Sequence, residues 1–315
     1  MKTRREVLTM NGVTTIKNNL VNHDLTSLFN EFIAYLDISK KSVESYKINL
    51  RQFFKYLQDN NLSNPQRQDI LDYKNSLINR GLKPTTIQAY LVSVKAFFSF
   101  LELKGYYPNI SRNIKGIKVS KSHKKDYLLK NQVKALLTSI DTSTLKGARD
   151  YAIISLMVTS GLRTIEVIRA DITDLRTIGN NQVLFIQGKG KNEKDNFVKL
   201  ADPVYKALVK YLTLSKHKGA LFVSTSNNSK GNRLSTWTIR QTISSYFKEQ
   251  GIKTDRLTAH SLRHTTATLN LLNGGTLEET KDLLRHESIN TTLIYSHHLD
   301  RMSNQSEERL ASLLF

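Results

Sequence analysis

The sequence of 315 residues predicts a mainly α-helical protein of two domains, with a small antiparallel β-sheet in the second domain. Residues 24–103 repeat the i, i+3, i+4, i+7 apolar spacing of amphipathic helices. From residue 131 onward, helical spacing alternates with two short strand-like runs. A basic stretch with little periodicity separates the two regions, and the chain is long enough for each region to bury its own core.

Apolar spacing predicts a helical domain at residues 24–108, preceded by an N-terminal extension at 1–23. The expected helices cover residues 25–36, 42–58, 66–79 and 84–101. The last of them begins at Pro84, which is favoured in a first turn because the amide hydrogen it lacks has no partner there. Short polar loops separate these helices, so we expect a compact helical domain.

Residues 127–315 are expected to form a domain that mixes helices with a small sheet and ends in an apolar tail. Its helices are predicted at 131–140, 147–159, 203–214, 235–249, 258–273 and from 276 onward. The strands 182–187 and 196–200 are joined by the loop GKGKNEKD, which predicts a hairpin. The tail SEERLASLLF carries an apolar strip, for which docking on a neighbouring molecule and packing on its own domain are both open.

The chain is strongly basic, with 47 Lys and Arg against 27 Asp and Glu and a net charge of +20. Such a charge attracts polyanions, which makes nucleic acid the expected partner. The segment 109–126 reads as an extended basic linker between the domains. Its candidate DNA contacts are Lys115, Lys118, Lys121, Lys124 and Lys125. A solvated tether is the alternative interpretation of the same residues.

Several classes of protein are disfavoured by composition. The chain has no cysteine, which excludes disulfides, thiolate metal sites and cysteine nucleophiles. No apolar run reaches the roughly 18 residues of a membrane span. The N-terminus lacks the apolar stretch of a signal peptide, so we expect a cytoplasmic protein with no membrane partner.

Four scattered motifs carry residue types that a core or a solvated surface does not require. They are TSGLRTIEV with Arg163, GKGK with Lys189, HSLRH with His260 and Arg263, and LLRHESINTTLIYSHH with His286 and Tyr295. Arginine forks suit the oxygens of a phosphodiester, lysine and histidine transfer protons, and tyrosine is a nucleophile towards phosphorus. Together they predict phosphoryl transfer on a polyanion.

A metal site is not expected among these motifs. His260 and His264 have the i, i+4 spacing of a zinc motif, but Ser261 stands where HExxH has glutamate. No cluster of acidic residues accompanies them. We therefore expect no cofactor, because the cationic side chains can neutralise the charge that develops on a phosphate.

The order Arg, Lys, His-x-x-Arg, His, Tyr resembles the tyrosine recombinase (phage integrase) family over nearly the whole chain, from about 24 to 300. In size and layout the chain is similar to the Xer recombinases and to short mobile-element integrases. The resemblance implies the two-domain tyrosine recombinase fold, with a helical SAM-like domain that binds core DNA and an α+β catalytic domain.

The resemblance also implies roles for the motif residues. Arg163 and Arg263 would grip the scissile phosphate, and Lys189 would protonate the leaving 5′-oxygen. The histidines would assist, His260 at the tyrosine proton and His286 at the phosphate. Tyr295 would attack. Glu166 would orient its neighbours, and His264 is expected to be supportive rather than catalytic.

The implied function is site-specific recombination of duplex DNA through a 3′-phosphotyrosyl intermediate and a Holliday junction. It would be carried out by a homotetramer, and participation of a second recombinase stays open. It would serve integration or excision, or resolution of a mobile element, plasmid or chromosome dimer. Two alternatives stay open: a catalytically silent DNA-binding protein of the same fold, and an enzyme similar to type IB topoisomerases.

The sequence departs from the family pattern at two places. Arg285 occupies the position before the second histidine where the family commonly has glycine, and it would contact phosphate or cover a helix end. Thr164 and Ile165 follow the first arginine, where the family often has a β-branched residue and then serine. Within the hairpin loop, Lys191 and Lys194 compete with Lys189 for the role of general acid.

Overall fold

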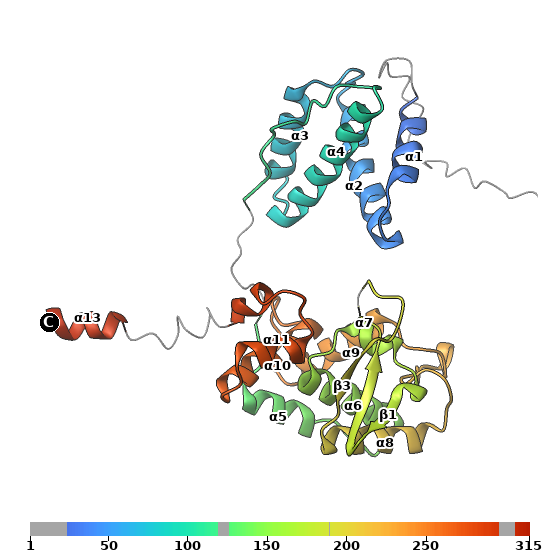
Figure 1. Ribbon diagram of the computed structural model, residues 1–315, viewed down its shortest axis with the longest axis vertical. Helices are drawn as coiled ribbons and strands as arrows, with labels where there is room; N and C mark the ends of the chain where they lie inside the picture. Colours follow the sequence, from blue (N-terminus) through green and yellow to red (C-terminus); the bar gives the residue numbers. More distant parts are fainter. Residues whose placement is uncertain (1–23, 119–125, 189, 296–305) are drawn as a thin grey trace, which may run out of the picture. The chain divides into compact units, whose positions relative to one another are not determined.

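The computed structural model describes residues 24–118, 126–188, 190–295 and 306–315. The chain divides into two compact units, Met1–Lys121 and Ser122–Phe315. Both are drawn in Figure 1, coloured along the sequence. The described residues are mostly helical and include a small antiparallel sheet, so the predicted fold class is confirmed.

The first unit is a helical bundle. Its helices are α1 (Leu25–Tyr35), α2 (Lys40–Asp59), α3 (Arg67–Asn79) and α4 (Pro84–Leu103). Side chains of Asp24 and Ser39 cap α1 and α2 by accepting hydrogen bonds from backbone amides. Buried aromatic rings such as Phe53 and Phe98 meet edge to face in the core, so much of its apolar surface comes from aromatic side chains.

Helix α4 is the centre of this core. By length and mean hydropathy it is the one described helix that could cross a membrane. Its apolar side chains are buried among α1, α2 and α3 instead, with Leu91, Val94 and Phe97 each no more than 1% exposed. The hydropathy of α4 is therefore that of a core helix.

Residues 109–118 of the segment expected to be a linker lie against the first unit. Ile114 is buried in its core. The side chain of Lys74 donates a hydrogen bond to the carbonyl of Lys115 at 2.9 Å, and Arg67 and Lys95 donate to neighbouring carbonyls. These hydrogen bonds to backbone carbonyls hold residues 109–118 against the helices, although the sequence of this stretch shows no apolar periodicity.

The candidate DNA contacts in this segment divide into two groups. The side chains of Lys115 and Lys118 are exposed on the surface of the first unit. Lys121, Lys124 and Lys125 lie outside the described residues. Their contact with DNA stays a prediction.

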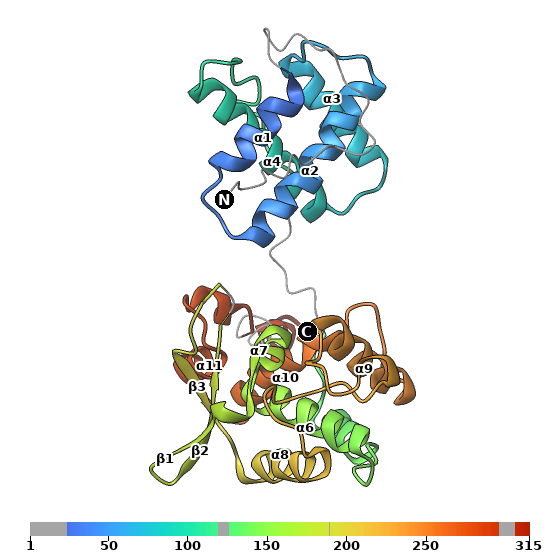
Figure 2. The same ribbon diagram turned by 90° about the vertical axis from the view of Figure 1, so that its right-hand side faces the viewer.

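The second unit contains a largely buried helix, α6. Its helices are α5 (Lys130–Thr138), α6 (Leu145–Ser160), α7 (Thr164–Arg169), α8 (Asp202–Ser215), α9 (Thr236–Glu249), α10 (Ala259–Leu272), α11 (Leu277–Leu284) and α13 (Ser306–Leu314). Most of α6 is buried, as its nearly continuous apolar run requires. Figure 2 shows the sheet at one side of this unit and α9 at the other, with α6 and α10 between them.

The sheet has the order β1-β2-β3 and is antiparallel throughout. Its strands are β1 (Leu175–Ile178), β2 (Asn181–Ile186) and β3 (Asn196–Lys199). Leu184 of β2 faces Leu175 on one side and Val198 on the other. The sequence predicted β2 and β3 but missed β1 and α7, because runs of four and six residues are too short to show a period.

Gly161 ends α6 in the left-handed conformation, at φ 59°. A Cβ atom at this position would lie 2.5 Å from Cδ2 of Leu284. We expect Gly161→Ala to lower the free energy of unfolding by about 2 to 4 kcal/mol, because backbone strain and overpacking add.

Chemical denaturation of Gly179→Ala supplies the matched control. Gly179 also has a positive φ, 55°, but a Cβ there meets nothing within 4 Å. Its loss of stability should reflect the backbone conformation alone, about 1 to 2 kcal/mol. Equal losses in the two variants would show that the contact with Leu284 contributes nothing.

Candidate active site

The motif residues meet where the C-terminal ends of α6 and α11 approach the first turns of α10. Arg163 follows α6, His260 and Arg263 lie on α10, and His286 follows α11. Figure 1 shows α7, α10 and α11 close together in the second unit. Segments that are far apart in the sequence therefore contribute to one site.

Arg163 is the N-cap of α7 and is held there by Glu166. The Arg163 amide donates to one carboxylate oxygen of Glu166 and its guanidinium donates to the other, both at 2.8 Å. The side chain of Glu166 is 1% exposed and that of Arg163 is 29% exposed. Glu166 thus holds a guanidinium that remains partly exposed, and the orienting role that the resemblance implied for Glu166 stays a prediction.

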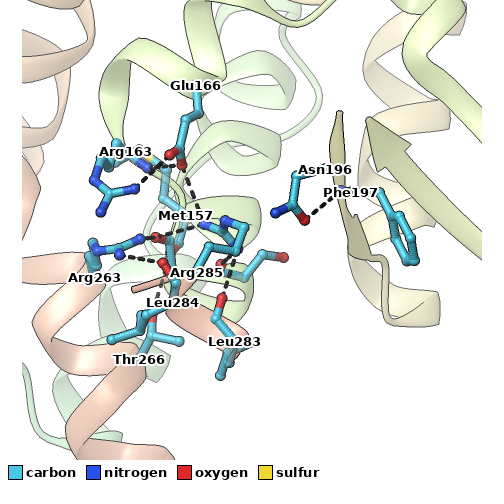
Figure 3. Close-up of polar contacts among 12 residues, drawn as sticks. Met157, Arg163, Glu166, Asn196, Phe197, Arg263, Thr266, Leu283, Leu284 and Arg285 are labelled. Atoms are coloured by element: carbon cyan, nitrogen blue, oxygen red, sulfur yellow. Dashed lines mark hydrogen bonds and ion pairs between the residues drawn. The ribbon is translucent and has the colours of Figure 1, made fainter. Parts of the chain in front are cut away.

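Arg263 is fully buried, and its guanidinium binds backbone carbonyls at two helix ends. It donates to the carbonyls of Gly161 and Leu284, at the C-terminal ends of α6 and α11. Carbonyls at helix C-termini lack intrahelical partners and carry partial negative charge, so they suit a cation. Figure 3 shows this side chain beside Arg163 and Arg285.

The site contains several positively charged side chains that repel one another. Burial, together with repulsion from Arg163 and Arg285, lowers the pKa of Arg263 to about 9. Burial also lowers the pKa of Arg285. Arg263 stays protonated at neutral pH. A bound anion would relieve this repulsion, so the charges of the cluster favour the binding of an anion.

Tyr295 lies at the same site, with its hydroxyl 2.7 Å from Nδ1 of His264. Burial raises the pKa of Tyr295 to about 12, although the charges of Arg263 and Arg163 oppose this rise. The His264 ring stacks edge to face on His260, with ring centroids 4.7 Å apart. The predicted nucleophile and the two histidines are therefore in one chain of contacts.

The contact of His264 with Tyr295 was not predicted. The i, i+4 spacing of His260 and His264 was a usable signal, because it places both imidazoles on one face of α10. His264 is 8% exposed, whereas His260 is exposed. The buried imidazole is the one at the tyrosine hydroxyl.

His286 is buried beside the arginines and donates to or accepts from Thr292, with Nδ1 2.9 Å from the threonine hydroxyl. Burial, followed by the charges of Arg263 and Arg163, lowers its pKa from 6.5 to about 4. His286 is therefore neutral at physiological pH, so it would contact a phosphate as a hydrogen-bonding group rather than as a cation.

This shift predicts that the protein loses stability in mild acid. Between pH 6.5 and 4 the unfolded chain binds the proton more readily than folded His286, so the free energy of unfolding falls as the pH falls. We expect a contribution of about 2 kcal/mol at about pH 4.5. Denaturation curves of wild type and His286→Asn over this range measure it. Identical pH slopes would contradict it.

The lysine of the β2–β3 loop, Lys189, lies outside the described residues. The loop around it is anchored at both ends: Arg169 donates to the carbonyl of Gly188 at 3.1 Å, and Lys194 pairs with Asp171 at 2.7 Å. Lys191 is exposed. Lys194 is held by ion pairs with Asp171 and Asp174, and Lys191 pairs more loosely with Asp195, at 3.8 Å. The identity of the proton donor in this loop stays a prediction.

Among the described residues, no three His, Asp or Glu side chains converge as metal ligands do.

Residues 126–302, more than half of the chain, match the model of the phage integrase family. The chain belongs to this family. Residues 29–105 match the N-terminal SAM-like domain of phage integrases, so the resemblance expected from the motifs is confirmed.

Named relatives are tyrosine recombinases. Tyrosine recombinase XerD of Listeria innocua is 31% identical over 291 residues, covering 87% of this chain and 94% of the relative. Tyrosine recombinase XerC of Thermodesulfovibrio yellowstonii is 27% identical over 287 residues, covering 87% and 91%.

Solved structures share the fold. The XerH recombinase bound to its difH substrate has a TM-score of 0.70 at 23% identity, covering 86% of this chain and 79% of the other. A lambda integrase dimer bound to a core site has a TM-score of 0.69 at 16% identity, covering 85% and 96%.

Proposed function

We propose that this protein is a site-specific recombinase that cuts and rejoins duplex DNA through a covalent bond between Tyr295 and a 3′-phosphate. The observation that carries the proposal is the anion site of Arg163 and Arg263 next to a buried tyrosine that is hydrogen-bonded to histidine. Tyrosine recombinases of similar length, matched over 94% of the Listeria sequence, support the same function.

In the cleavage step the Tyr295 oxygen attacks phosphorus and the bond from phosphorus to the 5′-oxygen breaks. The tyrosine proton passes to an imidazole, for which His264 is in contact and His260 lies next to it. The leaving 5′-oxygen takes a proton from Lys189, the role that the family resemblance implies. Attack by the 5′-hydroxyl of another strand reverses each change and rejoins the DNA.

The arginines stabilise the charge that develops on the phosphate during both steps. Guanidinium groups bind non-bridging oxygens as forks and are positioned before the reaction begins, so they lower the barrier without reorganisation. The phosphotyrosine conserves the energy of the broken bond. Neither ATP nor a metal ion is required by this chemistry.

The partner is double-stranded DNA with a specific core site, and the net charge of +20 favours it. We propose a homotetramer on a Holliday junction, as in a solved lambda integrase complex of the same fold. Exposed Leu310, Leu313 and Leu314 on α13 would dock on a neighbouring protomer. Such an enzyme acts on DNA in the cytoplasm.

A nicked suicide duplex tests the function. Native DNA flanking the gene, nicked beside the scissile phosphate, loses a short fragment after cleavage and traps the protein on DNA. We expect a slowly migrating adduct on a denaturing gel and exchange of strands between two sites. Tight, salt-sensitive binding without an adduct would indicate a silent DNA-binding protein. Relaxation of supercoils without a specific site would indicate a topoisomerase-like enzyme.

A further inference from the structure

Arg285 occupies a backbone position that disfavours arginine. It is the C-cap of α11 and has a positive φ of 55°. Left-handed conformations cost an L-residue more than glycine, because the Cβ atom crowds the following carbonyl. An arginine at this position therefore calls for a compensating interaction of its side chain.

The Arg285 side chain reaches back into the site and is 10% exposed. Its guanidinium donates to the carbonyls of Leu283 at 2.7 Å, Ser160 at 3.1 Å and Gly161 at 3.3 Å. It thereby covers the C-terminal ends of both α11 and α6. Figure 3 shows the contact with Leu283 and the ion pair with Glu166.

Glu166 is shared between two arginines. Its Oε1 accepts from Arg163 at 2.8 Å, and its Oε2 lies 3.3 Å from Arg285. With Arg263 included, these four side chains hold three positive charges and one negative charge. If Arg285 were absent, the buried carboxylate would be balanced more strongly by Arg163, its nearest remaining cation, and the attraction of that guanidinium for a phosphate would weaken.

We propose that Arg285 is a positioning residue of the phosphate site. Arg285 shares the carboxylate of Glu166 with Arg163, and so leaves the charge of Arg163 free for the scissile phosphate. Its contacts with Ser160 and Gly161 also fix the end of α6 from which Arg163 projects. The guanidinium of Arg285 is bound by three carbonyls and by Glu166, so we assign it a positioning role. This inference rests on the proposed function.

The test compares single-turnover rates of adduct formation on the suicide substrate. Arg285→Gly removes the charge and suits the left-handed backbone, and we expect it to slow cleavage about 10- to 100-fold. The matched control is Lys216→Gly, because Lys216 is an exposed cation at φ 52° that caps α8 away from the site. It should cleave at the wild-type rate.

A second substitution separates this role from simple structural support. Glu166→Gln removes the negative charge that would otherwise neutralise Arg163, and its amide keeps one oxygen that can still accept from Arg163. In the Arg285→Gly background it should restore at least about tenfold of the lost rate, because the two residues are coupled. If Arg285 only supported the structure, removing a second buried contact would not restore the cleavage rate.

Two results would overturn the inference: Arg285→Gly cleaving as fast as wild type, or the double variant being no faster than Arg285→Gly. If Arg285→Gly fails to fold, Arg285→Gln with and without Glu166→Gln makes the same comparison, because its amide can still donate to the carbonyls. Absence of an adduct with wild type would instead contradict the proposed function.

Discussion

Replacing Tyr295 with phenylalanine is expected to abolish covalent attachment to DNA, by more than about 10³-fold, because the ring loses the only atom that can attack phosphorus. DNA affinity should persist, since the cationic side chains are unchanged. The variant also loses the hydrogen bond to His264, so its free energy of unfolding should fall by about 1 kcal/mol. Adduct yield, gel-shift affinity and denaturation measure these effects.

Tyr246→Phe is the matched control. Its hydroxyl is also partly buried and hydrogen-bonded, to Asp150 at 3.3 Å, but it belongs to an ion-pair cluster outside the candidate site. We expect this variant to form the adduct at the wild-type rate. An adduct of undiminished yield from Tyr295→Phe would assign the nucleophile to another residue.

Arg263→Gln should reduce the rate of adduct formation by about 10³-fold. The substitution removes a buried charge from the phosphate site and leaves an amide that cannot span the carbonyls of Gly161 and Leu284 together. Stability should fall as well, by about 2 kcal/mol, because one carbonyl loses its donor. Single-turnover cleavage and chemical denaturation separate the two effects.

Arg149→Gln controls for the general cost of losing a buried guanidinium. Arg149 is 4% exposed, pairs with Asp150 and donates to the carbonyl of Val223. Its loss should destabilise the protein but leave the cleavage rate of the folded protein unchanged. Equal loss of rate in the two variants would mean that Arg263 acts only through stability.

The sequence was sufficient for most of the fold because its long helices repeat apolar residues with a clear period. Helix α2, predicted over 42–58, covers Lys40–Asp59. The four-residue strand β1 shows no such period. Residues 109–118 pack through hydrogen bonds to their carbonyls, which composition does not reveal.

The candidate site was predictable in its residue types but not in its internal contacts. Arg163 and Tyr295 are distant in the sequence, and only the combined motif indicated that they meet. The hydrogen bond between Tyr295 and His264 and the ion pair of Arg285 with Glu166 depend on tertiary packing. Helices that end in the left-handed conformation usually have glycine there, so the local sequence did not predict this conformation for Arg285.

Mapping the attachment site tests the central claim most directly. The trapped adduct is digested with protease and nuclease, and the remaining nucleotide is located by mass spectrometry. We predict a 3′-phosphate linked to the side chain of Tyr295, in the peptide that contains Thr291 and Thr292. Attachment to another residue, or through a 5′-phosphate, would contradict the account.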